Sequence, residues 1–148
     1  MIPERYATQL YALMRIVFGL VFLMYGLQKF GMLGGLDGNG AAAPTLSWPF
    51  GIAGVIEVLA GVLVTVGLLT NLAAFVASGE MAVAYFMVHV TGAIPIPIYP
   101  PHLLPVQNGG QPAVLFCFAF LYIAARGAGI WSVDGARSGA PGAGSARV

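Results

Sequence analysis

The amino-acid sequence predicts an all-α integral membrane protein, built as a four-helix bundle with both termini in the cytoplasm. Of the 148 residues, 59% are hydrophobic and 7% are charged, whereas about a quarter of the residues of a soluble domain are charged. Four segments each contain about 20 mostly apolar residues, the length that a membrane span needs. All the arginines lie near the span ends closest to the termini, and only Lys29 lies near the opposite ends. The positive-inside rule then places the termini in the cytoplasm.

The four predicted spans cover residues 8–32, 49–69, 71–92 and 112–131. The second opens with Trp48 at the level of the membrane interface and Pro49 in the first helical turn, where proline is tolerated. Because the second and third spans almost touch in sequence, we expect a tight antiparallel hairpin. Residues 1–135 then form one membrane domain, and the Gly-, Ala- and Ser-rich segment 136–148 is predicted to be a disordered tail.

The two long connections are predicted to face the outside of the cell. The first is rich in Gly, Ala and Pro and could hold a short interfacial turn. The second, residues 92–112, contains too many prolines to be helical. We expect it to form an ordered extended lid over the bundle or a flexible loop.

Composition and spacing argue against several classes of function. A net charge of +1 offers no electrostatic footprint for nucleic acid. A single cysteine, Cys117, excludes an intramolecular disulfide and a Cys-x-x-Cys motif. His89 and His102 have no carboxylate or thiol at a spacing that would complete a metal site, so we predict no metal and no intrinsic cofactor. We also expect the first span to be retained, because Arg15 interrupts the apolar core that a signal peptide needs.

The first span carries one narrow stripe of charged and small residues. Arg15, Gly19, Phe22, Gly26 and Lys29 fall within about 40° of one line along the helix. Charged side chains inside a membrane face protein or water, since exposure to lipid is costly. The stripe therefore predicts buried partners on other spans.

Carboxylates on the second and third spans are the candidate partners. From the helical rise of about 1.5 Å per residue, we expect Lys29 to pair with Glu57 in the outer half and Arg15 with Glu80 in the inner half. One interpretation is that both ion pairs only hold the helices in register. The other is that the outer pair lines a ligand pocket; its candidate residues are Lys29, Glu57, Tyr25, Gln28, His89 and Asn108. His89 and Glu80 fall on opposite sides of their helix, which argues against a single proton relay through both.

Several stretches together resemble a known family. They are LMRIVFGLVFLMYGLQKF, IEVLAGVLVTVGLLTNLAAF, NGGQP and GAGIWSVD. Their order and spacing resemble the DoxX family of small four-helix bacterial membrane proteins, which includes subunits of thiosulfate:quinone oxidoreductases. Two positions depart from the family pattern: Tyr25 stands where histidine is common, and Gln111 where an acidic residue commonly follows the glycine pair.

The resemblance implies a multi-pass subunit of the bacterial cytoplasmic (inner) membrane that serves a redox system linked to quinone. We expect an accessory subunit of an oxidoreductase rather than an enzyme by itself, with a membrane or periplasmic redox protein as its partner. Arg15, Lys29, Glu57 and Asn108 are the positions carried over from the family. In a quinone pocket, Lys29 and Tyr25 would donate to a carbonyl oxygen, and Glu57 would orient Lys29 or accept a proton.

Two other functions stay open from the sequence. The protein could be a non-catalytic anchor or assembly factor whose loops recruit a partner enzyme. It could also be a small-solute transporter, although the sequence shows neither the inverted repeat nor the broken helix typical of many transporters. The glycine-rich helix faces would serve either the bundle itself or a homo-oligomer.

Overall fold

The computed structural model describes residues 3–94 and 99–138, and within these ranges the chain is helical, with no strand. Four long helical stretches dominate: α1 (Ala7–Lys29), α2 (Phe50–Val66), α3 (Thr70–Ala84) with its π-helical continuation η2 (Tyr85–Val90), and α5 (Gln111–Arg126). Three short helices accompany them: η1 (Glu4–Tyr6), α4 (Pro105–Asn108) and α6 (Val133–Arg137).

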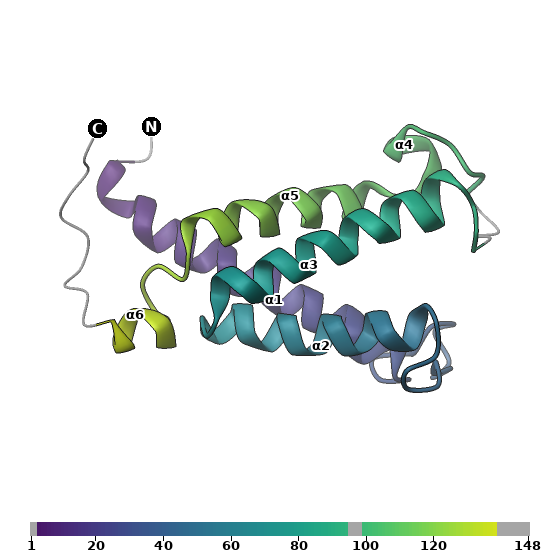
Figure 1. The fold of residues 1–148 in the computed structure, drawn as a ribbon, viewed down its shortest axis with the longest axis horizontal. Coiled ribbons are helices and arrows are strands. Elements are labelled where there is room, and N and C mark those ends of the chain that lie inside the picture. The colour runs from purple at the N-terminus through teal and green to yellow at the C-terminus, as the bar shows by residue number, and fades with distance from the viewer. Residues whose placement is uncertain (1–2, 95–98, 139–148) are drawn as a thin grey trace.

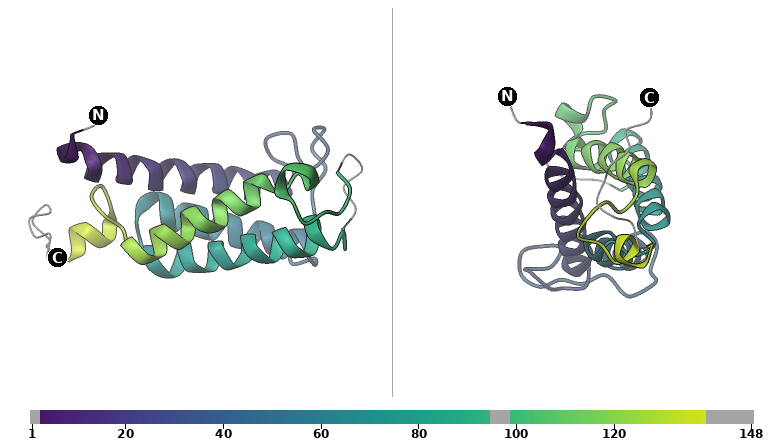
Figure 2. Two further views of the ribbon diagram at one scale, coloured as in Figure 1. Left: turned by 90° about the horizontal axis from the view of Figure 1, so that it is seen from above. Right: turned by 90° about the vertical axis from the view of Figure 1, so that its left-hand side faces the viewer.

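The long helices run roughly along one axis and pack as two pairs (Figure 1). Helix α1 packs along α2, and α3 packs along α5, while the tight α2–α3 hairpin joins the two pairs. Figure 2 shows η1 and α6 at one end of the bundle and the long loops with α4 at the other. We call these the terminal end and the loop end. The predicted ligand residues come from segments toward the loop end, whereas Arg15 of the predicted inner ion pair lies toward the terminal end.

The observed helices match the predicted spans to within a few residues, and glycines set two of the differences. Helix α2 ends at Val66 because Gly67 adopts the left-handed conformation at φ 71°, as helix C-caps commonly do. The fourth span was predicted to reach residue 131, but α5 ends at Arg126, where Gly127 has φ 83°. The chain after Gly127 therefore turns back toward the other helices.

The proline-rich connection differs from the sequence prediction in one respect. Residues Pro105–Asn108 form one helical turn, although this segment was predicted to be non-helical. The turn forms because Pro105 occupies a first-turn position, where no backbone N–H is required. The described part of the connection is ordered against η2, since the Tyr85 hydroxyl donates to the Leu103 carbonyl. Residues 95–98 of the predicted lid lie outside the described residues.

The predicted disordered tail begins too early in the chain. Ala136 and Arg137 belong to α6. This helix forms because the Ser132 side chain caps it by accepting from the Gly135 N–H. Residues 139–148 of the predicted tail lie outside the described residues.

The bundle is apolar both inside and outside. Phe22, Val64, Phe120 and Ile123 are fully buried in its core. Each long helix also exposes large apolar side chains on its outer surface: Leu13, Val17 and Met24 on α1, Leu59 and Val62 on α2, Leu72, Phe75 and Val83 on α3, and Leu115, Phe118 and Leu121 on α5. Two helical stretches, Glu4–Lys29 and Thr70–Val90, are long and apolar enough to cross a membrane by length and composition, and α2 and α5 are shorter apolar helices. The exterior of the bundle is thus suited to lipid rather than to water.

Candidate functional site

Helices α1 and α2 meet through glycines that let their backbones touch. A Cβ atom added at Gly26 would lie 2.7 Å from the Val58 nitrogen, and one added at Gly61 would lie 2.6 Å from the Leu23 nitrogen. Small residues of this kind allow close helix packing inside membranes. The close approach brings the loop end of α1 against the first turns of α2.

An ion pair occupies this interface near the loop end. The Lys29 Nζ lies 2.6 Å from one carboxylate oxygen of Glu57 and 2.7 Å from the other. The Glu57 side chain is 3% exposed, whereas 16% of the Lys29 side chain remains accessible. The contact predicted from helical rise is therefore present. Lys29 is the member of the pair that a ligand could reach.

Glu80 of α3 belongs to the same part of the bundle. It lies close enough to Glu57 and Lys29 for both charges to act on it. Its Oε2 atom is buried and has no hydrogen-bond partner among the described residues. The sequence assigned Glu80 to the inner half as the partner of Arg15, so its position near Lys29 and Glu57 is a new finding.

The ion pair predicted between Arg15 and Glu80 is not formed. The fully buried Arg15 guanidinium donates instead to main-chain carbonyls: Nη1 to Val64 and, at 2.8 Å, to Thr65, and Nη2 to Trp131 at 2.7 Å. The Val64 and Thr65 carbonyls lie in the last turn of α2, where they lack intrahelical donors and carry the negative end of the helix dipole. Arg15 thus neutralises a helix terminus rather than a carboxylate. Glu80 lies about 15 Å along α3 from its start, well away from that terminus.

Asp134 completes the contacts at the terminal end, and the sequence analysis did not single it out. Its carboxylate accepts from the Leu69 N–H at 3.1 Å and from the N–H and hydroxyl of Thr70, each at 3.0 Å. Its own N–H donates to the Gly67 carbonyl at 2.8 Å. The hydrogen bonds from Thr70 and Leu69 hold the pKa of Asp134 below its ordinary value. The Ser-x-Asp pattern of GAGIWSVD was the available signal, because Ser and Asp favour such capping roles.

Tyr25 and Gln28 lie beside the ion pair rather than around it. Together with Val21, Met24 and Leu33 they line a shallow depression of about 230 Å³ formed by α1 and the start of the following loop, and neither Lys29 nor Glu57 lines it. The Tyr25 ring packs edge-on against Phe116 of α5, with ring centroids 5.9 Å apart. This depression is mostly apolar, with a hydroxyl and an amide as its polar groups.

His89 and Asn108 contact each other at the lid. The His89 Nδ1 lies 2.9 Å from the Asn108 carbonyl oxygen. The Asn108 side chain donates to the His102 carbonyl at 2.6 Å and accepts from the Gly110 N–H at 2.7 Å. Because the nitrogen and the oxygen of the buried Asn108 amide both form hydrogen bonds within the connection, this side chain stabilises the loop conformation rather than facing a ligand. The predicted ligand residues therefore form three neighbouring groups at the loop end rather than one pocket.

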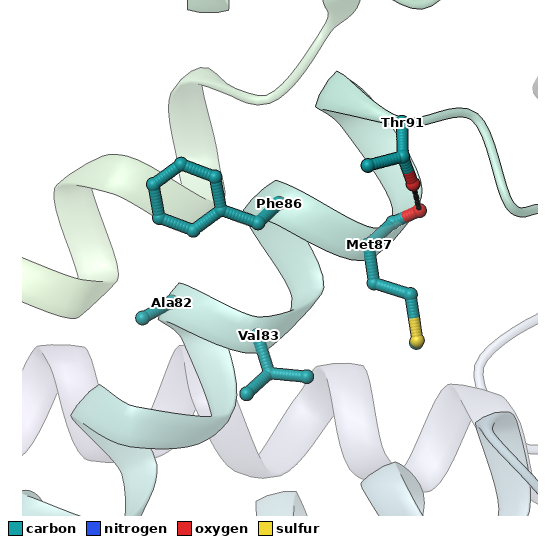
Figure 3. Close-up of a pocket in the computed structure, with 5 residues that line it drawn as sticks. All are labelled: Ala82, Val83, Phe86, Met87 and Thr91. Atoms are coloured by element: carbon teal, nitrogen blue, oxygen red, sulfur yellow. Dashed lines mark hydrogen bonds between the residues drawn. The ribbon is translucent and has the colours of Figure 1, made fainter.

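A larger depression lies elsewhere and contains none of the predicted residues. It has a volume of about 440 Å³ and is lined by Ala82, Val83, Phe86, Met87 and Thr91, all from α3, η2 and the residue that follows (Figure 3). Its one hydroxyl, on Thr91, already donates to the Met87 carbonyl at 2.8 Å. The depression is open and apolar, so it is a contour of the outer surface suited to a hydrocarbon chain.

The described residues offer few sites for other chemistry. Across 3–94 and 99–138, no three His, Cys, Asp or Glu side chains come together as metal ligands. Cys117 is a free thiol next to the Ser78 hydroxyl. The concentration of charge at Lys29, Glu57 and Glu80 is thus the arrangement best equipped to bind a polar group or exchange a proton.

Comparison with known proteins assigns the family. The chain is 38% identical over 136 residues to a Haemophilus influenzae protein described as "Uncharacterized protein", a match that covers 88% of this chain and 92% of that relative. No solved structure shows a significant match. The sequence profile of the DoxX family matches residues 10–90, which include α1 from its fourth residue onward and all of α2, α3 and η2. Arg15, Lys29, Glu57 and Glu80 lie within the match. The protein is a member of the DoxX family.

Proposed function

We propose that the protein is an accessory subunit of a quinone-linked redox system in the bacterial cytoplasmic membrane. It crosses the bilayer four times with both termini in the cytoplasm, and it binds a quinone-like ligand beside Lys29 in the outer half of the bundle. A membrane or periplasmic redox protein supplies the electrons.

The distribution of apolar and basic residues supports the four-span topology. All four long helices expose large apolar side chains. Helices α2 and α5, with 17 and 16 residues, are about 24–26 Å long, a few ångströms less than the hydrocarbon core of about 30 Å. Such a mismatch is accommodated by local thinning or by snorkelling of flanking residues at small cost. The arginines near the terminal end favour a cytoplasmic location for that end.

The main support for ligand binding is the hydrogen-bonding capacity of Lys29. An ammonium group has three N–H donors, and two hydrogen bonds from Nζ reach Glu57, with no third found among the described residues. The remaining donor and the partial exposure of the side chain suit a carbonyl oxygen. The neighbouring depression with Tyr25 and Gln28 offers an apolar surface for a ring.

A binding experiment tests this proposal. Wild-type protein in lipid nanodiscs is titrated with a short-chain ubiquinone and a short-chain menaquinone, with Lys29→Met as the test variant. Arg126→Met is the matched control, because it removes an exposed cation at the terminal end of α5. We expect Lys29→Met to weaken binding at least tenfold and Arg126→Met to leave it unchanged. Absence of binding to the wild type, or equal binding by the Lys29 variant, would overturn the proposal.

The second candidate function is a membrane anchor or assembly factor. It is favoured by large apolar side chains exposed on the loop-end connections: Leu46, Trp48, Leu103 and Val106. These residues would suit a partner protein seated on that end. Affinity purification of the complex separates the two functions. Under the quinone proposal Lys29→Ala spares the complex and abolishes its activity, whereas an anchor keeps both.

A further inference from the structure

We propose that Glu80 holds a proton in the resting protein, and that Glu57 and Glu80 exchange this proton while Lys29 switches between them. This makes Lys29, Glu57 and Glu80 one proton-binding cluster. The proposal concerns the cluster itself and does not require a quinone.

The α2–α3 hairpin places the two carboxyl groups at the same depth. Glu57 precedes the turn at Gly67 by about ten residues, and Glu80 follows Thr70 by about ten. At about 1.5 Å per residue both lie about 15 Å from the turn. Ala73 and Ala77, two turns and one turn earlier on the same side of α3 as Glu80, are buried. Helices α2 and α3 pack against each other, and the Glu80 Oε2 atom is buried without a hydrogen-bond partner among the described residues.

The charges of this cluster do not balance if both carboxyl groups are ionised. The charged groups that act on Glu80 are Lys29 from α1 and Glu57 from α2. Helix α5 carries a single charged residue, Arg126, at its far end. Lys29 already donates to both oxygens of Glu57, so a second carboxylate would be an unpaired anion beside another anion in an apolar interior. Such an anion is far more costly than a neutral acid.

The exchange conserves both protons and charge. In the resting state Lys29 is an ammonium paired with the Glu57 carboxylate, and Glu80 is a neutral acid. In the second state the proton has left the Glu80 oxygen and is bound to a Glu57 oxygen, and the ammonium pairs with the Glu80 carboxylate. No net charge is created within the apolar interior, and the flexible four-carbon stem of Lys29 lets the ammonium turn from one carboxyl group toward the other. The exchange therefore moves one proton between the two carboxyl groups and leaves the proton count and the net charge of the cluster unchanged.

Infrared difference spectroscopy of the protein in nanodiscs tests the proposal directly. A protonated carboxyl group has a C=O stretching band that shifts on exchange into D2O. We expect one buried carboxylic acid band in the wild type and none in Glu80→Gln. Glu57→Gln also loses the band, because Lys29 then pairs with an ionised Glu80. Lys29→Met doubles the band, because both carboxyl groups become neutral.

Two controls keep the test decisive. Glu4→Gln removes an exposed carboxyl group at the terminal end and leaves the band intact. Glu80→Gln replaces one neutral polar group by another of the same shape, so its melting temperature stays close to that of the wild type. A wild type without the band, a band that persists in Glu80→Gln, or a Glu80→Gln variant as unstable as Lys29→Met would each overturn the proposal. If Glu57→Gln does not fold, the carboxylic acid bands of Glu80→Gln and Lys29→Met still test the proposal.

Discussion

Replacement of Lys29 by methionine is the most informative perturbation of this bundle, because it leaves Glu57 buried without its cation. Two unit charges about 2.6 Å apart attract by about 6 kcal/mol at an effective dielectric constant of about 20. The folded variant has a less costly alternative, which is to protonate Glu57. From the ordinary glutamate pKa of about 4.3 and about 1.4 kcal/mol per pH unit, protonation costs about 4 kcal/mol at pH 7 and about 1 kcal/mol at pH 5.

The pH dependence of this cost has a definite sign. Between pH 5 and pH 7 the folded variant binds a proton at Glu57 that the unfolded chain does not bind. Its stability relative to wild type therefore falls as pH rises. The double variant Lys29→Met/Glu57→Gln has no buried charge at this pair, so at pH 7 it regains most of the stability that Lys29→Met loses.

Reversible unfolding in mixed detergent micelles at pH 5 and pH 7 measures these differences in the free energy of unfolding. Wild type at the same pH is the reference, which cancels the contribution of Glu80. An equal cost of Lys29→Met at both pH values would refute the reasoning. So would a double variant as unstable as Lys29→Met alone.

Three further predictions concern other contacts. Arg15→Lys keeps the charge, but the shorter lysine cannot reach the carbonyls of both α2 and Trp131. We therefore expect the variant to unfold several degrees below the wild type, and an unfolding temperature equal to that of the wild type would contradict this. Asp134 stabilises the folded state above the ordinary aspartate pKa of about 4 and loses this effect as pH falls through its lower folded pKa. Asp134→Asn therefore costs about 1 kcal/mol of stability at neutral pH, and stability measured against pH no longer shows the loss that protonation of Asp134 causes in the wild type. If the variant still shows that loss, another group is responsible for it. Gly61→Ala, which clashes with the α1 backbone, is expected to destabilise by about 1–3 kcal/mol, whereas Gly79→Ala faces open space and gains up to about 1 kcal/mol of helix propensity; equal unfolding energies would contradict this.

The sequence by itself determined the helical class, the approximate boundaries of the long helices and one contact of the site. Apolar runs and the glycines that end them are local signals, so α1, α2 and α3 with η2 could be predicted closely. The Lys29–Glu57 contact was predictable because helical rise sets the depth of each residue along its helix. The DoxX membership was also visible in the order of the motifs.

The partners of Arg15 could not be predicted in the same way. Depth along a helix does not say whether a carboxylate or a main-chain carbonyl faces a buried cation. In the folded bundle Arg15 lies level with the last turn of α2, where main-chain carbonyls are its partners. Carbonyls do not differ between residue types, so no residue in the sequence marks them as acceptors.

Only the tertiary structure decided the position of Glu80 and the role of the segment after α5. The antiparallel α2–α3 hairpin brings Glu80 to the level of Glu57 and Lys29, whereas the sequence paired it with Arg15. The segment after Gly127 folds back so that the Trp131 carbonyl accepts from Arg15 of α1, while Asp134 binds the residues where α2 ends and α3 begins. Both outcomes depend on contacts between residues far apart in the chain, and hydrophobic periodicity carries no information about such contacts.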